Sequence, residues 1–270
     1  MKSYTMRVHE GVKFVVIPAL ESLNLVYHGF STRVGGVSTG PFKSLDLGLS
    51  SGGDRDLVEI NRCVFLKALG SGNPETYTVR QVHGTRVLRI DPETLSLEAA
   101  RKMEADALMT DRPGVAIGVL TADCVPVLMV DPVNRAVAAV HAGRVGSLQS
   151  LVSRVLEAMH RDFGSSPQAI HAAVGPCIER DCYEISADMA DAIDSGPQGG
   201  SALVQKENGV HVLDLRKMNH EQLRDAGVPE KQIYHADLCT ACHPRTFYSY
   251  RRSQAKATGR MMAVIGIKAN

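Results

Sequence analysis

The chain has 270 residues, of which 44% are hydrophobic, so it is long enough to bury a core in one large domain or two small ones. Its 30 Lys and Arg residues nearly balance its 29 Asp and Glu residues, and the net charge of +1 excludes a general attraction to nucleic acid or to anionic membranes. Any preference for an anion must therefore be local.

Neither a secretory signal nor a transmembrane segment is predicted. Residues 1–10 lack a long apolar core, and Asp123 and Pro126 interrupt the apolar stretch 115–130. We therefore expect a cytoplasmic location. In that reducing compartment the six cysteines are expected to be free thiols or metal ligands rather than a disulfide framework.

The first half of the chain predicts an opening strand and a strand pair. Apolar residues alternate over residues 12–17, which is typical of a half-buried strand. Residues 76–82 and 85–90 predict a hairpin-like pair with His83-Gly84 at its turn. His83 would then lie at a strand end.

Three buried strands are predicted next, at residues 116–121, 125–130 and 135–140. A turn with proline at its second position joins the last two, because proline pre-sets the backbone for a turn there. Cys124 and His141 then also fall at strand ends.

Two helices follow from apolar spacing and end signals. Apolar residues recur three and four positions apart over 148–159, after a possible N-cap at Ser147 and before the terminator Gly164. A further helix is predicted from an Asp214 cap to Gly227.

An earlier helix is predicted from an apolar stripe that ends before Gly70. The stripe consists of Leu57, Ile60, Val64 and Ala68. It places Asn61 and Arg62 off the buried face or at its margin.

The mixture of strand pairs and strand–loop–helix units predicts the α+β (mixed α/β) class. We found no linker, repeat or low-complexity tract, and we interpret residues 194–201 as a surface loop. The chain is therefore expected to form a single domain over residues 1–270, a sandwich of mixed β-sheets with outer helices.

His83, Cys124 and His141 together suggest a mononuclear zinc site. Two imidazoles and a thiolate suit Zn(II), and three protein ligands leave a fourth tetrahedral position open, as in catalytic sites. The same soft donor set also admits copper.

Residues 143–147 form a glycine-containing loop between a strand and a helix. Backbone N–H groups at Gly143 and Arg144, together with the helix dipole, could face an anion such as phosphate. The loop lacks the lysine of a P-loop, and a tight turn also explains its glycines without any ligand.

The remaining cysteines allow several interpretations. The segment Cys239-Thr240-Ala241-Cys242-His243 matches the attachment pattern of c-type haem, which requires export to an oxidising compartment. Cys177 and Cys182 could join Cys239 and Cys242 in a structural zinc site. Free cysteines are the third alternative.

Several motifs, in order along nearly the whole chain, carry a family resemblance. They are His28-Gly29-Phe30-Ser31-Thr32-Arg33-Val34-Gly35-Gly36-Val37-Ser38, Asn61-Arg62, Gln81-Val82-His83-Gly84, Asp106-Ala107-Leu108, Thr121-Ala122-Asp123-Cys124-Val125-Pro126-Val127, Val140-His141-Ala142-Gly143, Gly175-Pro176-Cys177-Ile178 and Ser249-Tyr250-Arg251-Arg252. With these motifs the chain resembles the laccase-domain (polyphenol-oxidase-like) family. This family includes the peptidoglycan editing factor and purine nucleoside phosphorylases.

The resemblance implies a reaction and roles for particular residues. His83, Cys124 and His141 would be the metal ligands, and the substrates would be phosphate and a purine nucleoside: adenosine, inosine or methylthioadenosine. Arg62, and with it Arg33, would contact phosphate, because guanidinium groups bind phosphate bidentately. Some members also deaminate adenosine, for which zinc would activate water.

Asp123 and Arg144 are two further candidate site residues. Asp123, next to Cys124, could orient a histidine or accept a proton, but an aspartate that closes a strand is equally an ordinary turn residue. Family members commonly continue His-Ala-Gly with Trp-Arg-Gly, whereas this chain has Arg144, Val145 and Gly146 and no tryptophan. Arg144 would supply the arginine one position earlier.

Three alternative functions remain open at this point. One is copper-dependent oxidation of phenols, and a second is editing of peptidoglycan precursors. The third is a cysteine hydrolase with Cys124 as the nucleophile and His83 or His141 as the base.

Overall fold

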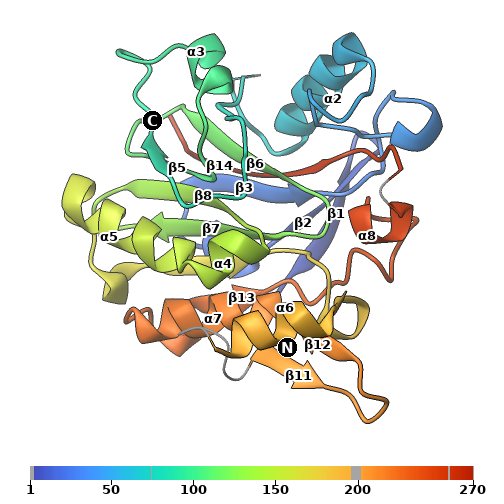
Figure 1. Ribbon diagram of the computed structural model, residues 1–270. Helices are drawn as coiled ribbons and strands as arrows, with labels where there is room; N and C mark the ends of the chain where they lie inside the picture. Colours follow the sequence, from blue (N-terminus) through green and yellow to red (C-terminus); the bar gives the residue numbers. More distant parts are fainter. Residues whose placement is uncertain (1–2, 74, 196–201, 255, 270) are drawn as a thin grey trace.

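The structure is a computed structural model that describes residues 3–73, 75–195, 202–254 and 256–269. Two large β-sheets lie in its centre, with α2 over one side and α4, α5 and α7 over the other (Figure 1). The predicted α+β class is confirmed. The ends of the two large sheets position the candidate site.

One sheet has five strands and is antiparallel throughout. In spatial order it contains β1 (Thr5–His9), β2 (Val12–Val16), β3 (Val26–Ser31), β14 (Met261–Ile267) and β6 (Ala116–Thr121). The predictions of strands at 12–17 and 116–121 are confirmed.

The second sheet has six strands, and parallel pairs occur at both of its edges. In spatial order it contains β13 (Ile233–His235), β9 (His171–Val174), β7 (Val125–Asp131), β8 (Ala136–Ala142), β5 (Ala107–Thr110) and β4 (Val87–Arg89). The predicted strands 125–130 and 135–140 correspond to β7 and β8, which pair as an antiparallel hairpin.

The central strands are buried on both faces, which explains their continuous apolar sequences. Along β7, Leu128 and Val130 belong to the core between the two sheets. Val127 and Met129, which alternate with them, belong to the core beneath α5 and α7. Their alternation shows that the six-stranded sheet separates two apolar cores.

A small third sheet and eight helices complete the described chain. The sheet contains β10 (Glu184–Ile185), β12 (His211–Leu213) and β11 (Leu203–Gln205). The helices are α1 (Pro18–Glu21), α2 (Arg55–Ala68), α3 (Leu97–Lys102), α4 (Arg144–Leu148), α5 (Leu151–Phe163), α6 (Ala187–Asp194), α7 (Leu215–Asp225) and α8 (Tyr250–Ser253). Most of the loop predicted at 194–201 lies outside the described residues.

The predicted hairpin over residues 76–90 is wrong. Residues 76–82 form only isolated parallel bridges, from Tyr77 to Ile117 and from Arg80 to Glu104, and β4 pairs instead with β5. The alternating sequence predicted a strand, but its backbone bonds are divided between two partners. His83 nevertheless lies in a turn, with a φ of 60°.

The buried face predicted for α2 is also wrong. The buried residues are Val58, Asn61, Arg62, Phe65 and Leu66, whereas Ile60 of the predicted stripe is 48% exposed. The Asn61 amide donates to the Asp46 carbonyl and to the Ser38 hydroxyl, and Nε of Arg62 donates to the Leu47 carbonyl. Hydrogen bonds therefore make burial of these two polar side chains tolerable.

The helix predicted over 148–159 is two helices. Ser147 lies inside α4 rather than at a cap, and Ser150, with a φ of 58°, separates α4 from α5. Gly164 ends α5 in the left-handed conformation, as predicted, because glycine adopts it without steric cost. The Asp214 cap of α7 is confirmed, since its carboxylate accepts from the Lys217 N–H.

Among the described residues, no helix combines the length and the apolar composition needed to cross a bilayer.

Candidate metal centre and cavity

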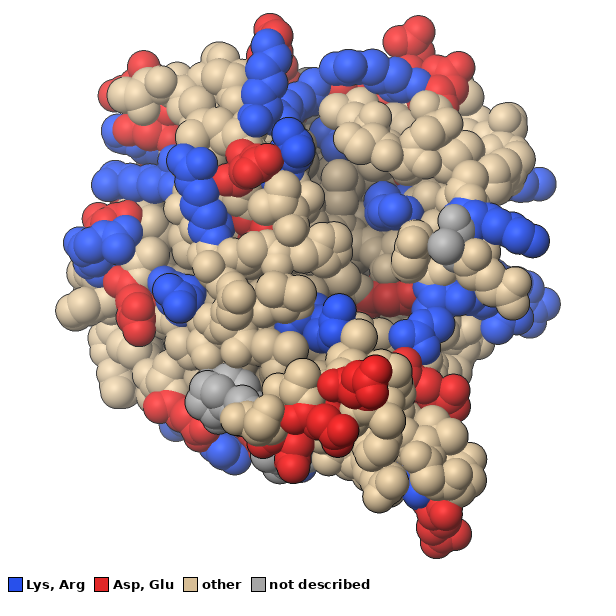
Figure 2. Space-filling model, in the orientation of Figure 1, with Lys and Arg blue, Asp and Glu red and all other residues tan. Residues whose placement is uncertain are grey.

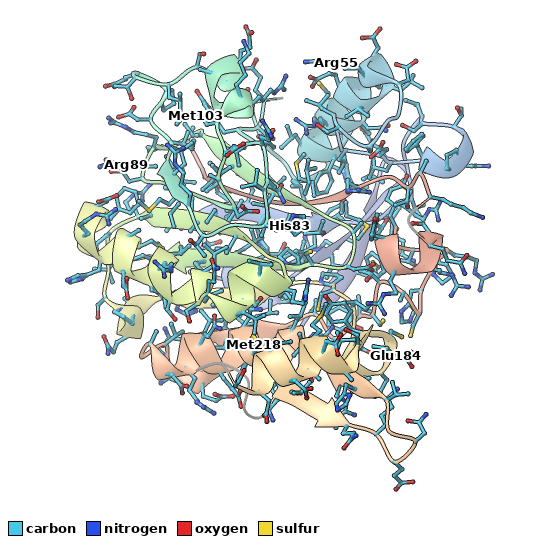
Figure 3. The ribbon with its side chains drawn as sticks, in the orientation of Figure 1. Arg55, His83, Arg89, Met103, Glu184 and Met218 are labelled. Carbon is cyan, nitrogen blue, oxygen red and sulfur yellow. The ribbon has the colours of Figure 1, made fainter. Side chains whose placement is uncertain are left out.

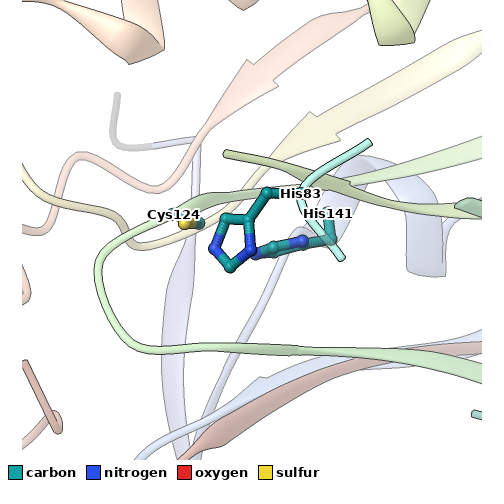
Figure 4. A group of neighbouring side chains, drawn as sticks. All are labelled: His83, Cys124 and His141. Carbon is teal, nitrogen blue, oxygen red and sulfur yellow. The ribbon is translucent and has the colours of Figure 1, made fainter. Parts of the chain in front are cut away.

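His83, Cys124 and His141 come from three separate segments and meet at one point (Figure 4). Cys124 immediately precedes β7, His141 lies near the end of β8, and His83 lies in the turn after residue 82. Their potential ligand atoms all lie within 4.8 Å of one another. The two imidazole rings are 4.8 Å apart between centroids and inclined at 75°, so they do not stack. The donors therefore surround a common position that a single ion could occupy.

Asp106 orients both histidines, a role that the sequence analysis did not assign. Its Oδ1 lies 2.8 Å from Nδ1 of His141 and accepts from the backbone N–H of His83 at 3.0 Å. Its Oδ2 accepts from the N–H groups of Val82 and Gly84. A carboxylate behind a ligating histidine fixes the ring and leaves the other nitrogen for the metal.

Burial alone would raise the pKa of Asp106, but the hydrogen bond with His141 and those from backbone N–H groups hold it below its usual range. Asp106 is therefore a carboxylate at neutral pH. As an acceptor-only group, it requires a proton on Nδ1 of His141 and so directs Nε2 toward Cys124.

Gln81 provides a second attachment for the turn that carries His83. Its side-chain amide donates to the Leu120 carbonyl and accepts from the Leu120 N–H, at the end of β6. The turn is thus fastened to the five-stranded sheet through Gln81 and to the six-stranded sheet through Asp106. This explains how an exposed histidine is held in place.

Asp123 determines how the chain enters β7 at Cys124. Its φ of 98° is unusual for a non-glycine residue. Its carboxylate accepts from the Thr240 hydroxyl at 2.6 Å, from the Ser249 hydroxyl at 3.0 Å and from the Arg251 N–H at 2.7 Å. With these donors on both oxygens, Asp123 positions the backbone beside Cys124.

Cys124 and His141 change each other's ionisation. Burial alone would raise the pKa of the Cys124 thiol, but the His141 and His83 imidazoles lower it to about 6. Burial alone would lower the pKa of His141, but the Cys124 thiolate and Asp106 raise it to about 9. At neutral pH these values favour a thiolate and an imidazolium, so a metal ion that binds both must displace a proton from His141.

Gly143 gives the three ligands the space they occupy. A Cβ atom there would lie 2.9 Å from Cδ2 of His83 and 3.3 Å from Sγ of Cys124. Glycine is needed here because of this close approach. Arg144 follows as the first residue of α4 and is half-buried.

A cavity of about 910 Å³ opens beside the triad, and its lining includes His83, Cys124 and His141. Four arginines also line it, namely Arg80, Arg144, Arg251 and Arg260. Among the described residues that line it, Asp123 is the one acidic side chain. Figure 2 shows this face of the molecule hollowed, with blue surface at the rim, and Figure 3 labels His83 near the middle of the same view. The lining of the cavity thus carries an excess of positive charge, of which the Arg80 guanidinium is paired with the Glu104 carboxylate at 3.3 Å.

Arg33 and Arg62 do not line this cavity. The Arg33 guanidinium donates to the backbone carbonyls of Lys43 and Pro244 and lies 4.5 Å from the centre of the Tyr248 ring. Arg62 is 4% exposed and donates to the Leu47 carbonyl. Of the arginines that the sequence suggested for phosphate, only Arg144 reaches the cavity.

A protein-family model described as multi-copper polyphenol oxidoreductase laccase matches residues 27–268. The chain belongs to this laccase family. A relative in Deinococcus radiodurans named purine nucleoside phosphorylase is 38% identical over 252 residues, which cover 93% of each chain. Purine nucleoside phosphorylase YlmD of Bacillus subtilis is 34% identical over 249 residues, covering 90% of this chain and 89% of the relative.

Solved structures of other laccase-family proteins have the same fold. YlmD from Geobacillus stearothermophilus matches with a TM-score of 0.89 at 29% identity, covering 100% of both chains. A YfiH protein of Bacillus licheniformis matches with a TM-score of 0.87 at 32% identity, covering 97% of this chain and 99% of the other. The family resemblance inferred from the motifs is confirmed.

Several residues of this laccase-family site were not assigned from the sequence. They are Asp106, the cavity arginines Arg80, Arg251 and Arg260, and Tyr183. Asp106 precedes a buried strand, so a buried carboxylate at a strand end was a usable signal. The arginines are scattered along the sequence, and their convergence depends on tertiary structure.

Proposed function

We propose that the protein is a zinc-dependent purine nucleoside phosphorylase acting on adenosine and inosine, with methylthioadenosine as a further substrate. The observation that carries the proposal is the meeting of the His83, Cys124 and His141 donors at a cavity lined by four arginines. The relatives named purine nucleoside phosphorylase support it.

The donor set fits zinc. Two imidazole nitrogens and one thiolate are ligands that zinc accepts, and Asp106 lies behind His141 as in other zinc sites. When bound, the ion would supply a Lewis acid at the end of the cavity. The chain's own contribution is to hold the three donor atoms around one position and to leave one side of that position open to the cavity.

The arginines support phosphate as the second substrate. Phosphorolysis breaks the bond between ribose C1′ and the purine nitrogen and joins C1′ to a phosphate oxygen, which releases the purine and ribose 1-phosphate. The reaction needs phosphate held in position for attack at C1′. Guanidinium groups bind phosphate oxygens bidentately, so the four arginines of the cavity lining are the proposed contacts, in place of Arg33 and Arg62. They are Arg80, Arg144, Arg251 and Arg260.

Two tyrosines in the cavity, Tyr183 and Tyr250, support purine binding. The Arg251 guanidinium lies 4.9 Å from the centre of the Tyr183 ring, which limits the ring's freedom to move. Flat aromatic side chains stack on purines, and Tyr183 or Tyr250 would serve in a chain without tryptophan. The cavity volume of about 910 Å³ is adequate for a nucleoside and a phosphate ion together.

The test is an assay of the purified, zinc-loaded chain with adenosine and phosphate. Adenine and ribose 1-phosphate should form, at a rate that depends on phosphate concentration. Inosine in the same mixture would reveal deamination, which the proposal allows at the same cavity. Product no greater than that of a Cys124→Ala variant would refute the phosphorylase proposal.

One observation favours a second candidate, a cysteine hydrolase. Cys124, His141 and Asp106 stand in the order nucleophile, base and orienting carboxylate, and the pKa of the thiol is lowered to about 6. The two functions require different states of one sulfur, because a zinc-bound thiolate is a poor nucleophile. Alkylation of Cys124 in protein that retains its full zinc content would favour the hydrolase, and protection would favour the phosphorylase.

Metal analysis distinguishes zinc from copper. Protein purified from medium with both metals should contain zinc, and oxidation of a phenol should not exceed the rate of the Cys124→Ala variant. Copper content accompanied by phenol oxidation would instead support the polyphenol oxidase alternative.

A further inference from the structure

A second group of three potential metal ligands lies outside the triad and consists only of sulfur. Cys182 ends a short 3₁₀ helix (Arg180–Cys182), and Cys239 and Cys242 lie in the segment after β13. Their Sγ atoms all lie within 4.8 Å of one another, and those of Cys182 and Cys242 are 3.3 Å apart. Residues about 60 positions apart along the chain are thus brought together.

The backbone around this group, which we call the thiol cluster, holds the sulfurs in place. Cys177 and Cys239 form a parallel bridge, and the Thr240 N–H donates to the Cys177 carbonyl at 3.0 Å. The Glu179 N–H donates to Sγ of Cys239 at 3.5 Å. N–H groups directed at sulfur are common around metal-bound thiolates, because they stabilise the negative charge.

The dimensions and exposure of the thiol cluster suit a metal ion. Zinc lies about 2.3 Å from each sulfur in a tetrahedral site, which puts the sulfurs about 3.8 Å apart, within the spread seen here. Cys239 is buried, Cys182 is half-buried and Cys242 is exposed. The inner ligand is therefore fixed, and an ion can reach the group from solvent.

Coordination to a metal ion would also ionise these sulfurs, because thiols release their protons when they bind a metal.

We propose that Cys182, Cys239 and Cys242 form a second metal site, for a thiophilic ion of the zinc class, separate from the triad. Its role is to fix the residues that form one wall of the cavity beside the triad. Tyr183 follows Cys182 and lines the cavity, and Thr240 follows Cys239 and donates to Asp123. An ion that fixes the three sulfurs thereby fixes the residues on which the cavity wall depends.

The test uses the full chain without the Cys124 thiolate, so that zinc bound at the thiol cluster is measured separately from zinc bound at the triad. Cys124→Ala protein is loaded with zinc, dialysed and analysed for metal and protein. We expect about one zinc per chain in Cys124→Ala, and close to none when Cys242→Ser is added. Cys242 is exposed, so its substitution leaves the core unchanged, and the exposed Cys63 provides the matched control Cys63→Ser, which should keep the zinc.

Cobalt substitution gives a second readout that does not depend on activity. Cobalt bound to thiolates absorbs in the near ultraviolet through sulfur-to-metal charge transfer. This absorption should persist in Cys124→Ala and disappear when Cys182→Ser or Cys242→Ser is added. A zinc content that is the same with Cys242→Ser as with Cys63→Ser would overturn the proposal.

A disulfide is the competing outcome, because the two nearest sulfurs could also be joined by oxidation. Mass spectrometry of the chain, purified in air without reductant and alkylated without prior reduction, would detect a Cys182–Cys242 bond, for which dissolved oxygen is the oxidant. Such a bond in protein that takes up no metal after Cys124→Ala also overturns the proposal. Neither result bears on the phosphorylase proposal, which rests on the triad.

Discussion

The triad and the thiol cluster each bring three potential ligands within 4.8 Å, yet their surroundings have opposite effects on sulfur. At the triad, imidazoles lower the pKa of Cys124 to about 6. In the thiol cluster, burial and neighbouring thiols raise the pKa of Cys182 to about 12. The triad is therefore arranged to carry charge beside a cavity, whereas the thiol cluster would carry charge only with an ion bound. Proximity of donors predicts binding, but their neighbours determine whether the site can perform chemistry.

Removing the thiolate of the triad should have the largest effect. Cys124→Ala should lower phosphorolysis by about 10³-fold or more, equivalent to about 4 kcal/mol, because the metal and its orientation are lost together. Cys242→Ser should lower the activity by less than about tenfold, since it acts only through the cavity wall. Steady-state rates with adenosine and phosphate give both values. Equal losses of phosphorolysis in the two variants would contradict the view that only the triad takes part in the chemistry.

Alkylation should separate the two sulfurs without reference to activity. In chelator-treated protein, a pH near 7 is above the Cys124 pKa of about 6, so Cys124 is a thiolate. The thiolate is protonated as the pH falls through about 6. At the same pH Cys182 is a protonated thiol, because its pKa is about 12. Iodoacetamide should therefore modify Cys124 roughly 10²-fold faster, after allowing for the lower nucleophilicity of the more acidic thiol. Peptide mass spectrometry over time measures this, and similar rates would contradict the assigned ionisation.

The carboxylate behind the triad lies 2.8 Å from the ring nitrogen of one candidate ligand, and Asp106→Asn tests its importance. An amide of the same shape cannot accept all the hydrogen bonds that Asp106 accepts, so zinc affinity should fall by about 10- to 100-fold. Competition with a chromophoric chelator measures the affinity. Asp131→Asn is the control, because Asp131 is also fully buried and accepts several N–H bonds, at the other end of β7. A comparable loss of affinity there would mean that Asp106 acts through general stability.

Positive charge also distinguishes the triad's cavity. Arg144→Ala should raise the KM for phosphate by about tenfold, because one bidentate contact is lost, with less effect on the KM for nucleoside. Arg154→Ala, at an exposed position on α5 outside the cavity lining, should leave both constants unchanged. An unchanged KM for phosphate in Arg144→Ala would show that phosphate binds elsewhere.

A smaller effect on zinc affinity is expected for Gly143→Ala, which only displaces a candidate ligand. Gly143→Ala would place a methyl group 2.9 Å from the His83 ring, and His83 would have to shift. Zinc affinity should fall by a few-fold to about tenfold, because an exposed histidine can adjust in part. Gly72→Ala is the matched control, since a Cβ there meets nothing within 4 Å. No difference between the two variants would show that the triad tolerates the displacement.

The sequence was most informative where one periodicity or one motif determined the structure. Doubly buried β7 and its hairpin with β8 were predictable, because uninterrupted apolar runs and a proline turn have few alternatives. The buried face of α2 was not, since tertiary hydrogen bonds to Asn61 and Arg62 override the apolar stripe. The segment 76–82 was assigned to a strand because its apolar residues alternate. Alternation does not show that the two bridges of this segment go to different partners.

The site could be predicted only in part for a related reason. The three candidate ligands were found because they lie in short, recognisable motifs. Asp106 and the cavity arginines act through positions that only the fold defines, and Arg62 was assigned to phosphate although its guanidinium is used inside the protein. Residue type indicates what a side chain can bind, but not which partner the fold brings to it.

The single carboxylate of Asp106 touches one histidine through its ring and the other through its backbone. The two imidazoles are consequently not independent parts, and a disturbance at either one is transmitted to its companion. Transplanting the three ligands alone into a foreign scaffold should therefore give a weak binder. The unit to transplant is the carboxylate with the turn that wraps around it.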